Sequence, residues 1–309
     1  MFAEKNVRLL LVIVLSGCSS PDVTTSNSAD SGTTLASVQK ATIKSGSSVA
    51  LALSTRYADT RENCGKESMP AFLCSGVILR GTEASTQYDS WNPSPTAIRV
   101  GGVSFSYIRS DYNIRRLAFD YSHGYILMPV LDTPSTKYQM EILCFFPVDG
   151  ASDNRSESGC GPTATYPVDS VPCGRQGITT GEQWRDHFNR HPTVYQWRCG
   201  FDVRDDIDAV AGRNFYQGLH GGRLVSPNSF NTPNDLKVKV WPQNIPGELP
   251  IEAFMYTLPA GLAGAQYDQK RFYSLTNIAL PIISVKLPAA QTGSATFTYM
   301  PTDQVILIP

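Results

Sequence analysis

Three polar residues stand within or at the ends of apolar runs that have the composition of β-strands. Arg80 ends the run V-I-L-R, Ser104 lies in the alternating run G-V-S-F-S-Y, and Glu141 begins the run E-I-L-C-F-F. The planar guanidinium of an Arg suits phosphate, because it donates two parallel hydrogen bonds to one anion. A carboxylate stabilises positive charge that develops on a reacting carbon. An Arg so placed could therefore bind a phosphate group, and a Glu so placed could stabilise a positive charge.

The order of these residues resembles the Arg–Ser–Glu pattern of the ADP-ribosyltransferases, which consume NAD. The resemblance implies that Glu141 is the catalytic carboxylate and stabilises the oxocarbenium-like ribose while the bond to nicotinamide breaks. It implies that Arg80 binds the pyrophosphate and that Ser104 orients Arg80 and Glu141 through hydrogen bonds. Gln139 stands where arginine-modifying relatives have Glu. The acceptor is therefore open between water, a protein side chain other than arginine and a small molecule.

The resemblance also implies an NAD-binding set around the first two motifs. Gly81 lets the backbone turn after Arg80, and Ser106 and Tyr107 follow Ser104 on one expected strand. Tyr107 could stack on the nicotinamide ring, although aromatic residues at such positions are more often part of a core. Each residue also fits an ordinary structural role on a strand, so their convergence on one cleft is the feature that separates an enzyme from coincidence.

Longer runs resemble the halovibrin group of secreted bacterial proteins, from about residue 55 onward. That group is associated with NAD glycohydrolase and ADP-ribosyltransferase activity, so the resemblance implies NAD as a substrate and requires no metal. The runs that carry it are C-S-G-V-I-L-R-G-T, W-N-P-S-P, G-G-V-S-F-S, C-G-F-D-V-R and G-L-A-G-A-Q-Y-D-Q.

The beginning of the chain has the form of an export signal. Lys5 and Arg8 precede the apolar run Leu9–Leu15, which is far shorter than the roughly 20 residues of a membrane-spanning helix. L-S-G-C at 15–18 resembles the lipobox of bacterial lipoproteins, which predicts a signal peptide over residues 1–17 and a lipidated Cys18.

The lipid would hold the protein at a membrane. In lipoproteins of this kind an Asp after the lipidated Cys is associated with retention in the inner membrane; this chain has Ser19 there, so the resemblance implies the outer membrane or the cell surface. If the segment is an ordinary signal peptide, the protein is secreted instead. Residues 18–45 are rich in Ser, Thr, Asp and Gly, which predicts a flexible tether. We expect a motif region over 46–150 and a β-rich half over 151–309, which can also form one continuous domain.

Six cysteines remain if Cys18 carries lipid, and an even number in an exported chain predicts three disulfides, with 15 connectivities. Local spacing favours Cys64–Cys74 and Cys160–Cys173, which leaves Cys144–Cys199 to join the two halves.

Metal and nucleic-acid partners are not expected. No C-x-x-C pair is present, and His187 and His191 have no Glu of the zincin type between them, so we expect them on a solvated helix face. The formal net charge of −1 and the lack of a basic run argue against nucleic acid. A serine hydrolase or a Rossmann NAD site is unsupported, because neither G-x-S-x-G nor G-x-G-x-x-G after a strand occurs.

The pattern of apolar runs predicts an α+β chain, and the resemblance implies an ADP-ribosyltransferase-like core of two packed β-sheets with flanking helices, plus a disulfide-stapled C-terminal half. Helices are expected near 111–119 and from a capping box at Thr180 to Arg190, with a helical patch at 205–217. Strands are expected at 71–80, 103–108, 125–131, 139–146, 199–203, 236–241, 251–256, 279–287 and 295–300. We therefore expect an exported, lipid-anchored NAD-cleaving enzyme; the alternative is a non-catalytic β-rich surface lipoprotein that acts as an adhesin or binding module.

Overall fold

The computed structural model describes residues 45–83, 89–95, 97, 102–129, 141–150, 160, 172–192, 198–204, 210–239 and 250–308. Gln139 and Cys18 lie outside the described residues, as do the expected signal peptide and nearly all of the expected tether.

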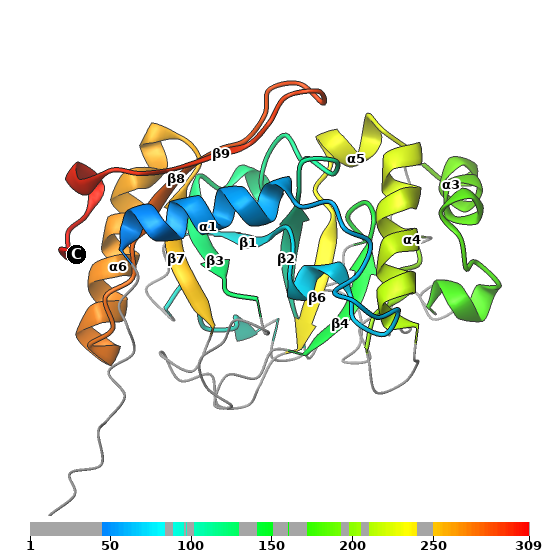
Figure 1. The fold of residues 1–309 in the computed structure, drawn as a ribbon, viewed down its shortest axis with the longest axis horizontal. Helices are drawn as coiled ribbons and strands as arrows, with labels where there is room; N and C mark the ends of the chain where they lie inside the picture. Colours follow the sequence, from blue (N-terminus) through cyan, green and yellow to red (C-terminus); the bar gives the residue numbers. More distant parts are fainter. Residues whose placement is uncertain are drawn as a thin grey trace, which may run out of the picture. The chain divides into compact units, whose positions relative to one another are not determined.

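One nine-stranded sheet organises the described chain, in the order β5-β4-β6-β2-β1-β3-β7-β8-β9 (Figure 1). Neighbouring strands are antiparallel, except that β7 and β8 are parallel. The α+β class is confirmed, but these strands form one mixed sheet where two packed sheets were expected. The strands are β1 (Val77–Thr82), β2 (Gly102–Ile108), β3 (His123–Leu127), β4 (Ile142–Phe146), β5 (Phe201–Asp202), β6 (Asp235–Lys239), β7 (Ile251–Tyr256), β8 (Ile282–Lys286) and β9 (Thr296–Tyr299).

Strands from both halves of the sequence are neighbours in this sheet. β6 comes from the second half of the chain and lies between β4 and β2, and β7 from the same half lies beside β3. Stretches 46–150 and 151–309 therefore share one sheet and are not separate layers.

Helix α1 (Gly46–Ala58) covers one face of the sheet. Its Val49 and Leu53 pack with Val77 and Leu79 of β1 and with Ile108 of β2. Because side chains alternate along a strand, these residues define one side of β1 and β2, which we call the α1 face.

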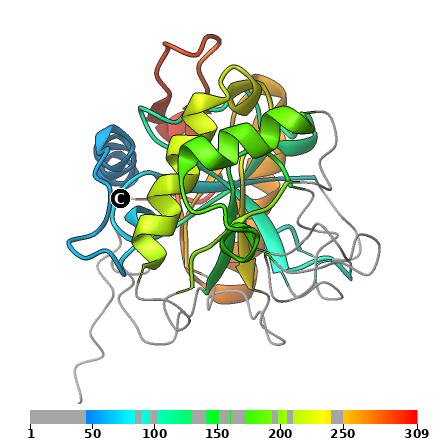
Figure 2. The ribbon, with the colours of Figure 1, turned by 90° about the vertical axis from the view of Figure 1, so that its right-hand side faces the viewer.

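Helices α4 (Ala211–Leu224) and α6 (Leu262–Thr276) cover the opposite face, which we call the α4/α6 face. Phe215 of α4 and Phe272 of α6 belong to the same core as Ile78, Phe105 and Tyr125. Figure 1 shows α4 and α6 at opposite ends of the sheet. Figure 2 shows α3 (Gly181–Arg190) as the outer layer beside α4. The other helical pieces are α5 (Asn228–Asn231), η1 (Ala71–Leu73), η2 (Ala118–Asp120), η5 (Cys173–Gln176), η7 (Pro259–Gly261) and η8 (Pro301–Asp303).

The capping box at Thr180 is confirmed, because its hydroxyl accepts from the Gln183 amide and the Gln183 side chain caps the Thr180 backbone. The helix expected over 111–119 is wrong. Asp111 pairs with Arg109 and with Arg223 of α4 instead of capping a helix, and only the short η2 turn forms nearby.

Three disulfides are present, as expected, but only one predicted pairing is confirmed. Cys64–Cys74 forms, whereas the other two bonds are Cys144–Cys160 and Cys173–Cys199. The pairings Cys160–Cys173 and Cys144–Cys199 are wrong. The fold brings Cys199, next to β5, to the start of η5, where the Cys173 amide donates to the Gly200 carbonyl. Three disulfides are typical of a compartment outside the cytoplasm.

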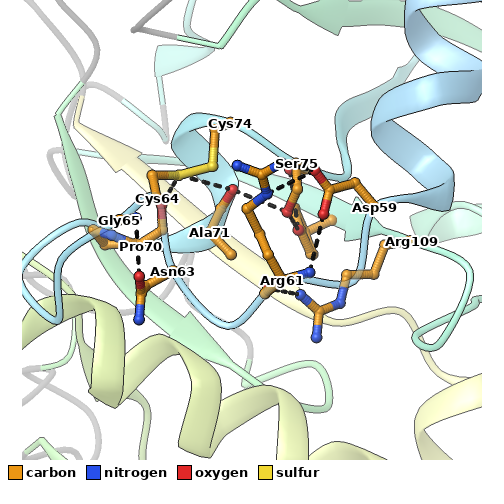
Figure 3. The surroundings of a disulfide bond; sticks show 11 residues. Asp59, Arg61, Asn63, Cys64, Gly65, Pro70, Ala71, Cys74, Ser75 and Arg109 are labelled. Carbon is orange, nitrogen blue, oxygen red and sulfur yellow. Dashed lines mark hydrogen bonds and ion pairs between the residues drawn. A yellow bond between two sulfur atoms is a disulfide. The ribbon is translucent and has the colours of Figure 1, made fainter.

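The confirmed disulfide holds the connection between α1 and β1 (Figure 3). Beside it, Arg61 pairs with Asp59, and the buried Arg109 donates to the Arg61 carbonyl. These contacts fix the segment that leads into β1, the strand that carries Arg80. Within the described residues, no helix is long and apolar enough to cross a membrane.

Candidate functional site

Arg80 lies near the end of β1 and points to the α4/α6 face. It is paired across the strands with Tyr125 of β3, and its guanidinium lies 5.9 Å from the centre of the Phe105 ring. Its Nη1 donates to the Ser104 carbonyl oxygen at 2.6 Å. The backbone of Ser104 thus orients Arg80, where the hydroxyl of Ser104 was expected to do so.

Ser104 points to the α1 side of the sheet. Its neighbours Val103 and Phe105 pack into the α4/α6 core, so alternation places the Ser104 side chain opposite to them. Lys237 of β6 is its cross-strand partner and lies on the same side.

Glu141 precedes β4 and also lies on the side away from α4 and α6. Ile142 next to it belongs to the α4/α6 core, and the Glu141 carboxylate pairs with Lys239 at 2.7 Å. Its side chain is 40% exposed, so this ion pair is solvated. β2 and β6 separate β4 from β1.

The three residues that sequence order grouped together therefore do not share one cleft. Ser104 and Glu141 are on one side of the sheet, and Arg80 is on the other. Gly81 packs against Leu117 on the α1 face.

The remaining residues of the expected NAD-binding set are buried. Tyr107 is fully buried and donates to the Ser75 carbonyl at 3.1 Å, so its ring belongs to the core and is not exposed for stacking. The Ser106 hydroxyl donates to the Asn234 carbonyl at 3.5 Å on the other side of β2.

A second set of polar residues lies on the Arg80 side of β1 and β3. Thr82 of β1 pairs with His123 of β3, two positions from the pair of Arg80 with Tyr125. Asp268 of α6 covers His123, with 3.9 Å between Nε2 and Oδ2. Register and helix packing thus bring Arg80, Thr82, His123 and Asp268 to one end of one face.

Helix α6 approaches His123 closely because Gly264 has no side chain. A Cβ built on Gly264 would lie 2.6 Å from the imidazole ring. Asp268 follows one helical turn later, so it stands on the same side of α6. Trp91 packs edge-on against Phe272 of α6, with 5.1 Å between the ring centres, and brings the adjacent Ser90 to this helix.

Several buried polar atoms of this set have no hydrogen-bond partner among the described residues. They are Thr82 Oγ1, His123 Nε2 and Asp268 Oδ2, and Ser90 Oγ, Trp91 Nε1 and Asn92 Oδ1 lie in the adjoining segment. Asp268 is 3% exposed and Thr82 is 6% exposed. Buried polar atoms are rarely left unpaired in proteins, so such a concentration is typical of a functional site.

Burial favours the neutral forms of the two titratable side chains Asp268 and His123. Burial raises the pKa of the Asp268 carboxyl to about 7, although the Ser90 hydroxyl opposes the shift. Burial lowers the pKa of the His123 imidazole. Near pH 7, Asp268 therefore exchanges its proton readily while His123 is neutral.

Sequence reasoning missed His123 and Asp268 because they are far apart in the chain and each looks ordinary alone. A usable signal was present. The runs W-N-P-S-P and G-L-A-G-A-Q-Y-D-Q are distinctive in the sequence, and the fold packs Trp91 of the first against α6, the helix that contains all but the first residue of the second.

No protein-family model matches the chain, and no curated protein matches its sequence. In the described part of the chain, no three His, Cys, Asp or Glu side chains form a group that could hold a metal ion.

His187 was expected on a solvated helix face, but the structure buries it, at 8% exposure.

Proposed function

We propose that this chain cleaves the nicotinamide–ribose bond of NAD, as an NAD glycohydrolase, a mono-ADP-ribosyltransferase or both. The proposal includes export and a lipid anchor at Cys18. The acceptor is water or a nucleophile that is not yet identified.

The setting of Arg80 carries the proposal. Arg80 is half-buried, and its guanidinium is oriented by the Ser104 carbonyl and has no carboxylate partner among the described residues. Most other described arginines have one, as Arg56, Arg116 and Arg271 do. A guanidinium that is fixed but not neutralised is suited to bind a pyrophosphate.

The reaction also needs a group that responds to the positive charge on the ribose. Glu141 is the residue that the family resemblance implies, but it lies across the sheet from Arg80 and pairs with Lys239. Asp268 lies on the same face as Arg80. Both residues lie close enough to Tyr125 to affect its pKa. Burial raises the pKa of the Tyr125 hydroxyl to about 12; the charge of Arg80 lowers this pKa, and the charge of Asp268 raises it. We therefore place NAD on the α4/α6 face.

The test is nicotinamide release from NAD by the purified, oxidised protein. Arg80→Ala removes charge-assisted hydrogen bonds worth about 1.5–3 kcal/mol each, so losing two lowers kcat/KM by at least about 100-fold. Arg80→Lys keeps the charge but loses the planar fork, and we expect a smaller loss. Arg185→Ala is the control, because Arg185 pairs with Asp186 on the exposed surface of α3.

The variant Glu141→Gln tests on which face of the sheet the reaction takes place. If NAD lies on the α4/α6 face, this variant keeps most of the activity. An inactive Glu141→Gln protein with an active Arg80→Ala protein would move the site to the Ser104 side. Absence of nicotinamide release from the folded wild type would refute the NAD proposal.

A non-catalytic surface-binding module is the second candidate, and the separation of Arg80 from Ser104 and Glu141 favours it. A surface pocket of about 520 Å³, lined by Arg115, Arg116, Asp120 and Asn231, offers a recognition surface. Phe119 beside it is 81% exposed. This candidate predicts a folded wild-type protein that releases no nicotinamide, so the same assay decides between the two.

A further inference from the structure

The gap between the side chains of His123 and Asp268 is wide enough for one atom of a third molecule to bind both. The distance of 3.9 Å between Nε2 and Oδ2 is too long for a hydrogen bond. One oxygen atom could still lie about 2.8 Å from both atoms, within normal hydrogen-bond length. Both atoms lack a hydrogen-bond partner among the described residues.

The elements around the pair hold few charges that could neutralise it. On β7, Tyr256 pairs across the strands with His123, and its hydroxyl donates to Asp303. Asp89, beside Ser90, is paired with Arg271 of α6. Arg80 lies two positions from Thr82 on β1. The surroundings of the pair are thus mostly neutral or internally paired groups, and burial controls its protonation.

We propose that His123 and Asp268 form a proton-accepting pair that deprotonates the attacking nucleophile, a water molecule or a hydroxyl group. For its substrate this inference rests on the proposed NAD cleavage; for its geometry it rests only on β3 and α6. The nucleophile would sit between Nε2 and Oδ2, on the face that carries Arg80.

The step balances without another reactant. The bond between ribose C1′ and the nicotinamide nitrogen breaks, and its electron pair stays on that nitrogen and neutralises the pyridinium. The oxygen of the nucleophile bonds to C1′. Its proton passes to Nε2 of His123, and the Asp268 carboxylate stabilises the imidazolium that forms. The proton is then released to solvent, so hydrolysis yields nicotinamide, ADP-ribose and one proton.

The kinetic test compares His123→Gln and Asp268→Asn with the wild type. Loss of a general base typically costs about 10²–10⁴-fold, so we expect kcat to fall at least about 100-fold in each variant while the KM for NAD changes little. His220→Gln is the matched control, because His220 forms an exposed pair with Glu182 at 2.7 Å on α4 and α3. Circular dichroism and thermal melting establish that each variant is folded.

The pH dependence gives a readout that a merely structural role would not produce. Since burial raises the pKa of Asp268 to about 7, the wild-type rate rises with pH and levels off above this value. In Asp268→Asn the residual rate loses this inflection, and any remaining one lies below the ordinary His value of about 6.5, because burial lowers the pKa of His123. An unchanged inflection in Asp268→Asn overturns the proposal.

A substrate-free measurement keeps the pair separate from the NAD proposal. The carboxyl carbon of Asp268, assigned by its loss in Asp268→Asn, should titrate near pH 7 by NMR, and its removal should shift the His123 titration. If the wild type cleaves NAD and both variants match it, the pair is refuted and NAD cleavage stands. If the wild type does not cleave NAD, the titration alone decides. Coupled titration near pH 7 supports the pair, and uncoupled titration at ordinary values refutes it.

Discussion

Removal of the Cys144–Cys160 disulfide tests the connectivity that separates the structure from the spacing-based prediction. We consider Cys144→Ala together with Cys160→Ala, in a chain that also carries Cys18→Ser. The bond closes a separation of 16 residues, for which the chain-entropy estimate is about 3 kcal/mol. For a domain of this size, 1 kcal/mol lowers Tm by about 2–4 °C, so we expect a loss of about 6–12 °C.

The number of free thiols in the denatured, unreduced variant gives the sharper result. With the connectivity of the structure, Cys173 and Cys199 stay bonded to each other, and Cys64 stays bonded to Cys74, so a thiol reagent detects none. The spacing-based pairing would leave two thiols, one on Cys173 and one on Cys199. Two thiols per chain would refute the arrangement of β4, η5 and β5 described above.

Three further perturbations probe the core and the Asp268 region. Glu252→Gln removes the carboxylate that pairs with the buried Arg56, so urea unfolding should show that the free energy of unfolding falls by about 3–5 kcal/mol. A fall of less than about 1 kcal/mol would contradict the ion pair between α1 and β7. The folded Asp268 carboxyl keeps its proton to about pH 7, whereas the unfolded one releases it near 4, so its contribution to stability is greatest at acid pH and is lost as pH rises to about 7. Asp268→Asn should therefore gain stability relative to wild type between pH 4 and 8, by roughly 4 kcal/mol at most, and a constant difference would argue against a raised pKa. Gly264→Ala places a Cβ 2.6 Å from the imidazole of β3 and should cost about 1–3 kcal/mol, whereas Gly174→Ala, with nothing within 4 Å, should cost far less.

Local patterns predicted many elements well. The run at 251–256 is strand β7 with the predicted bounds, and the capping box predicted the start of α3. Helix α6 was not predicted, because its sequence L-A-G-A-Q-Y-D-Q-K-R-F-Y-S-L-T mixes apolar and polar residues without a clear stripe. Its helical form depends on packing against β3 and β7, which is a tertiary contribution that a sequence window does not contain.

The amino-acid sequence by itself determined the α+β class, the positions of most strands and the presence of three disulfides. These follow from periodicity and composition, which act over a few residues. Cysteine partners, strand order and the face on which a side chain points were decided only by tertiary structure, because they depend on pairing between distant segments. Arg80 and Ser104 belong to neighbouring strands but have side chains on opposite faces, and a shift of one residue in register would reverse that arrangement. His123 and Asp268 are far apart in sequence, and only the packing of α6 through Gly264 brings them together.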